Sequence, residues 1–165
     1  MFDNVKYFLI AMAQEKLSHT FYLSYVTLLR QGKLQLLSAG ANFNLTLIQT
    51  LTLLLMANVH ELSMGDLGRL YACDASNVTG IVDGLEEKEL VARQSCPGDR
   101  RIKMIVLTPA GKQLQARLFE RLAAASDDIF TVLTPDERKQ FVHLVVKVSN
   151  HLRAAEGGIF PQLTP

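Results

Sequence analysis

The sequence predicts a mainly α-helical fold with one small β-hairpin, and three observations support this class. Apolar residues recur every three or four positions near both ends of the chain, which is the period of an amphipathic helix. Two short helical patterns are separated only by Ala72 and Cys73, the tight connection that a helix-turn-helix requires. From Leu90 the pattern becomes that of two strands around a turn at residues 97–99. We therefore expect a winged helix-turn-helix core plus a helical dimerisation region formed by the N- and C-terminal helices.

Composition limits the class of protein. The chain has 165 residues, 48% hydrophobic and 20% charged, which fits a globular domain, and a net charge of +1 excludes a nonspecific polycation. The two cysteines form no disulfide framework and no CxxC pair. The N-terminus lacks the basic start of a signal peptide, and the apolar run at residues 45–59 is too short to span a bilayer comfortably. We expect a soluble, cytoplasmic protein without a cofactor.

A long helix is expected from Val5 to about Arg30. Its apolar stripe is wider than one small partner can cover, so it should pack on another subunit or on the far terminus. Residues 31–44 contain glycine, serine and asparagine and predict a loop.

Capping residues mark the helices in the middle of the chain. Thr46 with Gln49 forms a capping box that should begin a helix reaching about Ala57. Ser63 with Asp66 repeats this pattern less strongly and opens a short helix that ends near residue 71.

Asp74 should cap a third helix that continues to about Lys88. Its inward face is expected to be formed by Val78, Ile81, Val82 and Leu85. Further on, the Thr-Pro pairs at 108–109 and 134–135 are helix starts, and they predict helices at about 109–131 and 135–154. The last residues should be irregular.

The outward face of the third helix has residue types that can read DNA. Asparagine can bond adenine, serine and threonine can donate to bases or phosphates, and small residues let the backbone approach. The exposed positions are expected to be Ala75, Ser76, Asn77, Thr79, Gly80 and Asp83. Because serine, asparagine and aspartate also cap helices, this face alone leaves a purely structural role open.

The hairpin adds positive charge beside that helix. Its basic residues are Arg93, Arg100, Arg101 and Lys103. Asp99 can hydrogen-bond an arginine and hold it extended, and an arginine at a hairpin tip can enter the DNA minor groove. The alternative is a solvated edge hairpin whose charges deter sheet pairing. Together with the helix-turn-helix, the hairpin favours binding to duplex DNA.

These motifs resemble the MarR family of bacterial winged-helix transcription regulators over nearly the whole chain. Asp99, Arg101 and Leu107-Thr108 match that family's D-x-R-x5-L-T pattern. Further matches are Leu45-Thr46 with Gln49, and Val78-Thr79 with Val82-Asp83 and Leu85-Glu86. Their order and spacing make the resemblance fairly specific. The chain departs from the family pattern at Gly84, where arginine is frequent, and at Glu89, where glycine is frequent.

The resemblance implies one MarR-type domain over residues 1–165, with a DNA-binding lobe at 45–108 and dimerisation helices at 1–31 and 109–156. It implies an obligate, triangular dimer with the third helix in the major groove and Arg101, oriented by Asp99, in the minor groove. The expected function is a sequence-specific homodimeric repressor of a pseudo-palindromic operator. A transcriptional activator, a redox-responsive regulator and a protein-interaction module without DNA binding are the alternatives.

Regulators of this family commonly bind small aromatic or phenolic anions between the dimer helices and the DNA-binding lobe. The resemblance makes His19, Tyr22 and Met56 candidate ligand residues, although ordinary packing explains each of them as well. No arginine or lysine is clearly placed by the sequence to pair with an anion.

Other chemistries have weaker support. Cys73 is expected to be a small buried thiol, and Cys96 lies among arginines that could lower its pKa. His143 and His151 share a helix face without a further metal ligand, and the pair at residues 60–61 should lie in a loop. The sequence contains no nucleophile–base pair and no phosphate-binding loop, so we do not expect an enzyme.

Overall fold

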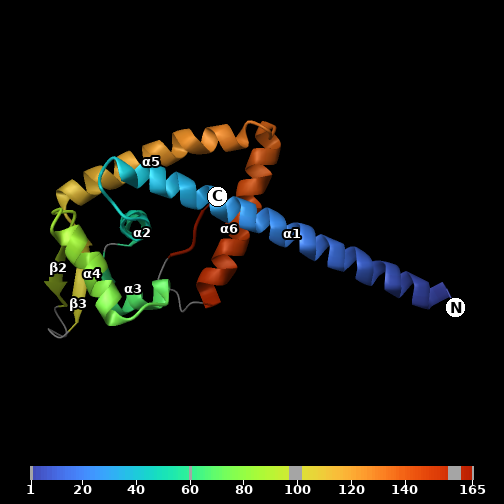
Figure 1. Ribbon diagram of the computed structural model, residues 1–165, viewed down its shortest axis with the longest axis horizontal. Coiled ribbons are helices and arrows are strands. Elements are labelled where there is room, and N and C mark those ends of the chain that lie inside the picture. Colours follow the sequence, from blue (N-terminus) through green and yellow to red (C-terminus); the bar gives the residue numbers. More distant parts are fainter. Residues whose placement is uncertain (1, 60, 97–101, 156–160, 165) are drawn as a thin grey trace.

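The computed structural model describes residues 2–59, 61–96, 102–155 and 161–164 (Figure 1). Three long helices form an extended frame, and a small lobe of short helices with a three-stranded sheet lies at one end of it. The long helices are α1 (Phe2–Ala41), α5 (Pro109–Phe130) and α6 (Pro135–Ala155). The lobe contains α2 (Leu47–Leu55), η1 (Met56–Asn58), β1 (Glu61–Ser63), α3 (Met64–Tyr71), α4 (Ala75–Glu86), β2 (Val91–Ser95) and β3 (Lys103–Leu107).

Helix α1 is longer than its sequence predicts. The loop expected at residues 31–44 is wrong, because the helix continues to residue 41 and only a turn at 42–44 follows. Packing explains the difference. A Cβ atom at Gly40 would lie 2.2 Å from Oγ1 of Thr50, and Gln35 Nε2 donates to the carbonyl of Ala125 at 3.0 Å. Contacts of α1 with α2 and α5 therefore outweigh the weak helix propensity of residues such as Gly40.

The predicted helix starts in the lobe are confirmed. Gln49 N donates to Thr46 Oγ1 at 3.2 Å, and Thr46 N donates to Gln49 Oε1 at 3.0 Å, so the capping box is complete. Ser63 and Asp66 form a second complete box. Burial raises the pKa of Asp66, but hydrogen bonds from Ser63 and Arg69 outweigh burial and bring the pKa below its usual value. The helices thus begin where the capping residues specify.

Helix α4 ends at Glu86, two residues before the predicted end at Lys88, and a left-handed turn follows it. Glu89 has a φ of 58°, its N–H donates to Glu86 O at 2.8 Å, and Leu90 N donates to Leu85 O at 3.0 Å. This pair of hydrogen bonds is a Schellman motif, which usually has glycine at the left-handed position.

The sheet has three strands in the order β1-β3-β2, all antiparallel. The two hairpin strands are confirmed, but β1 was not predicted, because three residues are too few to show an alternating pattern. Glu61 lies in β1 rather than in the loop expected there, and residue 60 lies outside the described residues. Leu62 of β1 pairs with Ile105 of β3, and both are completely or almost completely buried.

A close backbone contact joins the lobe to α5. A Cβ atom at Gly111 would lie 1.9 Å from the carbonyl oxygen of Leu90, so only glycine fits at this place. Thr108 Oγ1 donates to Glu89 O at 2.6 Å, and Thr108 N donates to Leu90 O at 3.1 Å. The turn after α4 is therefore fixed directly on the first turn of α5.

The predicted starts of α5 and α6 are confirmed within one residue, and residues 161–164 have no regular structure. In the part of the chain that the structure describes, no helix combines the length and the hydropathy needed to cross a membrane.

The left-handed turn gives a stability prediction. Glu89→Gly should raise the free energy of unfolding by about 1 kcal/mol, because a residue with a side chain pays a steric cost in this conformation. Urea unfolding followed by circular dichroism measures the change. The matched control is Glu87→Gly, whose right-handed φ of −55° gives glycine no advantage, so this variant should be less stable. A loss of stability in both variants would contradict the assignment.

Candidate nucleic-acid interface

Helices α3 and α4 form the predicted helix-turn-helix. The connection is short because Ala72 adopts a φ of 48° and Cys73 N donates to Gly68 O at 3.1 Å. Leu67 of α3 and Val78 of α4 are fully buried in the lobe core. This core fixes the orientation of α4 relative to the rest of the lobe.

The outward face of α4 is exposed, as the sequence predicts. All six expected positions are solvent-exposed, while Val78, Val82 and Leu85 are buried on the other side. Ser76 Oγ donates to Asp74 Oδ1 at 2.7 Å, and Thr79 Oγ1 donates to the carbonyl of Ala75 at 2.8 Å. Those exposed positions are Ala75, Ser76, Asn77, Thr79, Gly80 and Asp83.

The start of α4 is negatively charged. Asp74 Oδ1 accepts a hydrogen bond from Asn77 N at 2.9 Å. This bond, and a further one from the Ser76 hydroxyl, lower the pKa of Asp74, so its carboxylate stays ionised at neutral pH. Among the described residues the Asn77 side-chain amide makes no hydrogen bond within the chain, and it remains available to an external partner.

Arg93 is held against α4 rather than projecting from the hairpin. Its Nη2 donates to Asp83 Oδ1 at 2.7 Å, its Nη1 contacts Glu86 Oε2, and its backbone N–H donates to Glu86 Oε1 at 2.9 Å. The strand β2 is thereby connected to the last turns of α4. The sequence placed Arg93 and Asp83 on a DNA-facing surface but gave no sign that they pair, because ten residues and a turn separate them.

The hairpin stem is described, and its tip is not. Lys103 on β3 is exposed and donates from Nζ to Ser95 Oγ at 2.9 Å, while Cys96 N donates to Ile102 O at 3.1 Å at the end of the ladder. The predicted DNA-binding residues at the tip, Asp99, Arg100 and Arg101, lie outside the described residues.

Gly84 has a packing role on the inner side of α4. It is half-buried, and a Cβ atom there would lie 2.5 Å from Gln49 Nε2, the amide of the capping box on α2. Close packing against Gln49 therefore disfavours a larger residue such as arginine at this position.

The three candidate ligand residues do not form one site within the chain. Met56 is 2% exposed in a core cluster that includes Ala39 of α1, whereas Tyr22 is 63% exposed and His19 is also exposed. Tyr22 lies 17 residues from Ala39 on the same helix, which is about 25 Å along its axis. Their role as ligand residues stays a prediction.

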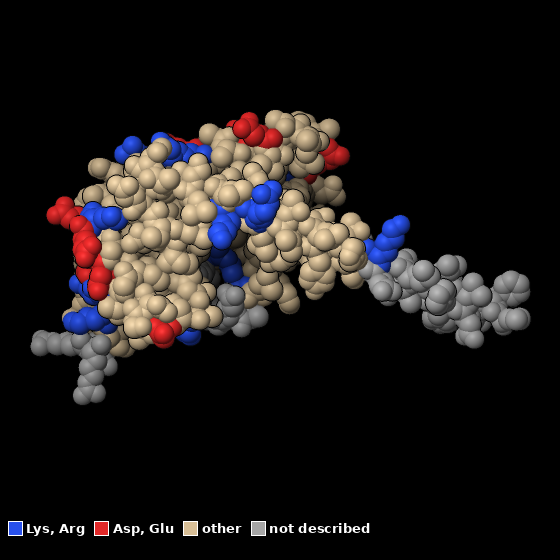
Figure 2. Space-filling model, in the orientation of Figure 1, with Lys and Arg blue, Asp and Glu red and all other residues tan. Residues whose placement is uncertain are grey.

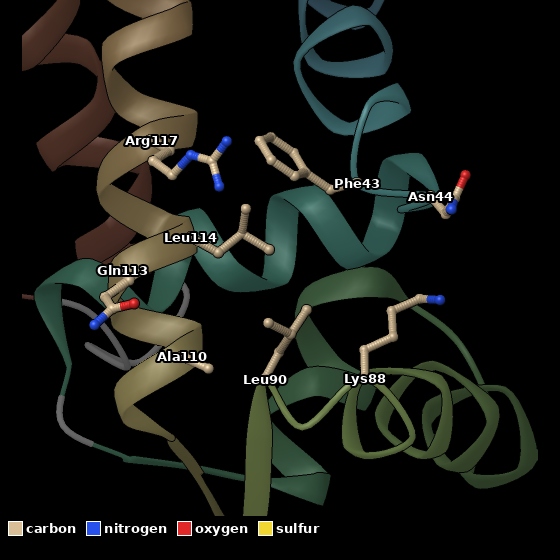
Figure 3. Close-up of a pocket in the computed structure, with 8 residues that line it drawn as sticks. All are labelled: Phe43, Asn44, Lys88, Leu90, Ala110, Gln113, Leu114 and Arg117. Carbon is tan, nitrogen blue, oxygen red and sulfur yellow. The ribbon is translucent and has the colours of Figure 1, made fainter.

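A different cavity, of about 450 Å³, lies where the lobe meets the long helices (Figure 3). Its apolar part comes from Phe43, Leu90 and Leu114, and the guanidinium carbon of Arg117 lies 4.8 Å from the centre of the Phe43 ring. Lys88 extends along another part of the rim. The remaining lining residues are Asn44, Ala110 and Gln113, so none is acidic. The sequence alone does not reveal this pairing of cations with apolar groups, because the residues come from three separate segments.

Residues for other chemistry are not clustered in the described part. Within residues 16–154, where they are described, no group of three histidine, cysteine or acidic side chains could hold a metal ion. Cys73 and Cys96 are both half-buried and unpaired with each other.

Comparisons with known proteins agree with the sequence-based resemblance. The sequence model of the MarR family matches residues 43–102. BpsR of Bordetella bronchiseptica, whose DNA binding is regulated by 6-hydroxynicotinic acid, is 26% identical over 78% of this chain and 91% of its own, with a TM-score of 0.60. A MarR family transcriptional regulator from Silicibacter pomeroyi is 26% identical over 80% of this chain and 88% of its own, with a TM-score of 0.63.

A third structure of similar fold, reduced AbfR bound to DNA, is 23% identical over 86% of this chain and 97% of its own, with a TM-score of 0.59. The family model thus matches the lobe, and the chain as a whole has a mainly α-helical winged-helix fold similar to that of MarR regulators.

Proposed function

We propose that this chain is a sequence-specific DNA-binding transcription regulator that represses as a homodimer. The observation that carries the proposal is the exposed face of α4, which consists mainly of small and polar residues, on a helix whose other face is buried. Such a face can enter the major groove of DNA. The MarR family match and the regulated DNA binding of BpsR support the same function.

Gly80 supports close approach of a partner to this face. It lies in the middle of α4, and a Cβ atom there would meet no described atom within 4 Å. A glycine inside a helix lowers stability by about 1 kcal/mol relative to alanine, and no described contact requires glycine at this position. Close approach of the α4 backbone to base edges would explain the glycine.

The hairpin is the second contact in this proposal. Arg101, oriented by Asp99, enters the minor groove, and Arg100 and Lys103 contact phosphates beside it.

Single substitutions on the two elements should have different effects on DNA binding. Arg101→Ala should weaken operator binding by about 1–3 kcal/mol, while Asn77→Ala should relax the choice of base in the major groove. An operator is first selected from a random duplex pool, and affinities are measured by fluorescence anisotropy at one salt concentration. Lys139→Ala, which removes a cation from α6, is the control. Wild-type affinity in both test variants would count against the proposal.

The long helices support the dimer. From residue 18 to residue 31 every described side chain of α1 is exposed, although many are apolar. Figure 2 shows this part of α1 leaving the body with almost entirely uncharged side chains on the visible face. A helix with so wide an apolar face is normally covered by another element. Exposed apolar residues of α6 that would join the interface are Phe141, Leu144, Val145, Val148 and Leu152.

A charge on the exposed face of α6 should therefore disrupt the dimer. Val148 is 60% exposed, and Val148→Asp should convert a dimer into a monomer in analytical ultracentrifugation. Operator affinity should fall about 100-fold or more, because two linked reading heads bind more tightly than one. The matched control is Val132→Asp in the turn after α5, where valine is 83% exposed. An unchanged dimer in the Val148 variant would exclude α6 from the interface.

The cavity beside Phe43 is the proposed effector site. An apolar floor with Arg117 and Lys88 at its rim fits a small aromatic anion. Because the cavity lies between the end of α4 and α5, an occupant could favour one spacing of the two heads and so release DNA.

Ligand binding at this site should depend on Arg117. Benzoate and 6-hydroxynicotinate serve as probes, and a probe at about 100 times its dissociation constant should stabilise the protein by about 2.7 kcal/mol in thermal unfolding. Arg117→Gln should reduce this gain strongly, whereas Tyr22→Phe should retain it. The reverse result would place the effector near the N-terminal helix instead.

A further inference from the structure

The proposed reading helix has an unfavourable charge for contact with DNA. Between Ala75 and Glu86 it contains no lysine or arginine, and it carries two carboxylates, Asp83 and Glu86. Asp83 lies on the exposed face, and its side chain is 50% exposed. Because phosphates line both edges of the major groove, a free carboxylate on this face would repel DNA.

Among the described residues, Arg93 is the cation that contacts both carboxylates. Its two terminal nitrogens are engaged by different partners, Nη2 by Asp83 Oδ1 at 2.7 Å and Nη1 by Glu86 Oε2. The guanidinium fork suits such double contact better than an ammonium group does. Its backbone N–H also donates to Glu86 Oε1, so three contacts in all join Arg93 of β2 to α4.

We propose that Arg93 is a positioning residue that neutralises the reading helix from the neighbouring strand. It draws the Asp83 and Glu86 carboxylates toward β2 and away from the phosphates, and it reduces their combined charge to −1. Asp83 is then held by Arg93 and does not read bases, and Arg93 acts through α4 instead of contacting DNA. This inference rests on the proposed DNA-binding function and revises the roles that the sequence assigned to both residues.

The contact contributes to DNA binding chiefly through charge. The side chain of Asp83 is 50% exposed, so water screens its pair with Arg93 and the contribution of this pair to stability is small. Repulsion between a carboxylate and the phosphates would act in both subunits of a dimer, and its strength would fall as the salt concentration rises. The effect of charge can therefore be separated by experiment from the effect of holding β2 against α4.

The experiment compares amide variants, of which Asp83→Asn and Glu86→Gln keep the shape of the side chain and Arg93→Gln removes its positive charge. Arg93→Gln should weaken binding to the selected operator roughly tenfold at about 50 mM salt, and the loss should shrink at about 200 mM. Adding Asp83→Asn and Glu86→Gln to Arg93→Gln should restore affinity to the wild-type value or above it. The triple variant lacks both ion pairs, so affinity would not recover if Arg93 served only to hold β2 against α4. Arg93→Lys, which keeps the charge, should retain most of the affinity.

Thermal unfolding of every variant shows whether the lobe remains folded. A folded triple variant that binds as weakly as Arg93→Gln overturns the proposal, and so does an Arg93→Lys variant as weak as Arg93→Gln. Asp83→Asn alone should leave the order of preferred operator sequences unchanged, and a changed base preference would return Asp83 to a base-reading role. If the wild-type protein selects no duplex at all, the proposed function fails instead, and this result is distinct from the others.

Discussion

The contact between the turn after α4 and the start of α5 is the constraint on which the arrangement depends. At Gly111 the α5 backbone approaches the Leu90 carbonyl so closely that a side chain would not fit, and Thr108 bonds the same turn twice. The end of α4 is thus part of the same rigid unit as the first turn of α5. A movement of the long helices would carry α4 with it, which is the coupling that the proposed switch requires.

The cavity at Phe43 lies at this junction. Its residues come from the turn before α2, from the turn after α4 and from the first turns of α5. An occupant there would contact the lobe and the long helices at once. A ligand shifts a conformational equilibrium only through such differential contacts, so this position is physically suited to regulation.

The reading helix shows how charge and shape can be arranged on different elements. Small and polar residues of α4 provide a surface that can approach DNA, while the positive charge lies on the strands beside it. Arg93 connects the two, since it belongs to β2 and holds two carboxylates of α4. The exposed apolar faces of α1 and α6 are a separate property, and in the proposed function they form the dimer interface.

Local signals in the sequence determined much of the fold. Capping residues such as Thr46, Asp74 and Thr108 fix helix starts through bonds to the next turn, so their effect can be read within four residues. The exposed face of α4 also follows from its period alone. Tertiary structure decided the features that join distant segments: the extension of α1 through Gly40, the short strand β1, the pairing of Arg93 with Asp83 and Glu86, and the cavity beside Phe43. These depend on contacts across many residues, and such contacts leave no periodic or capping pattern in the chain.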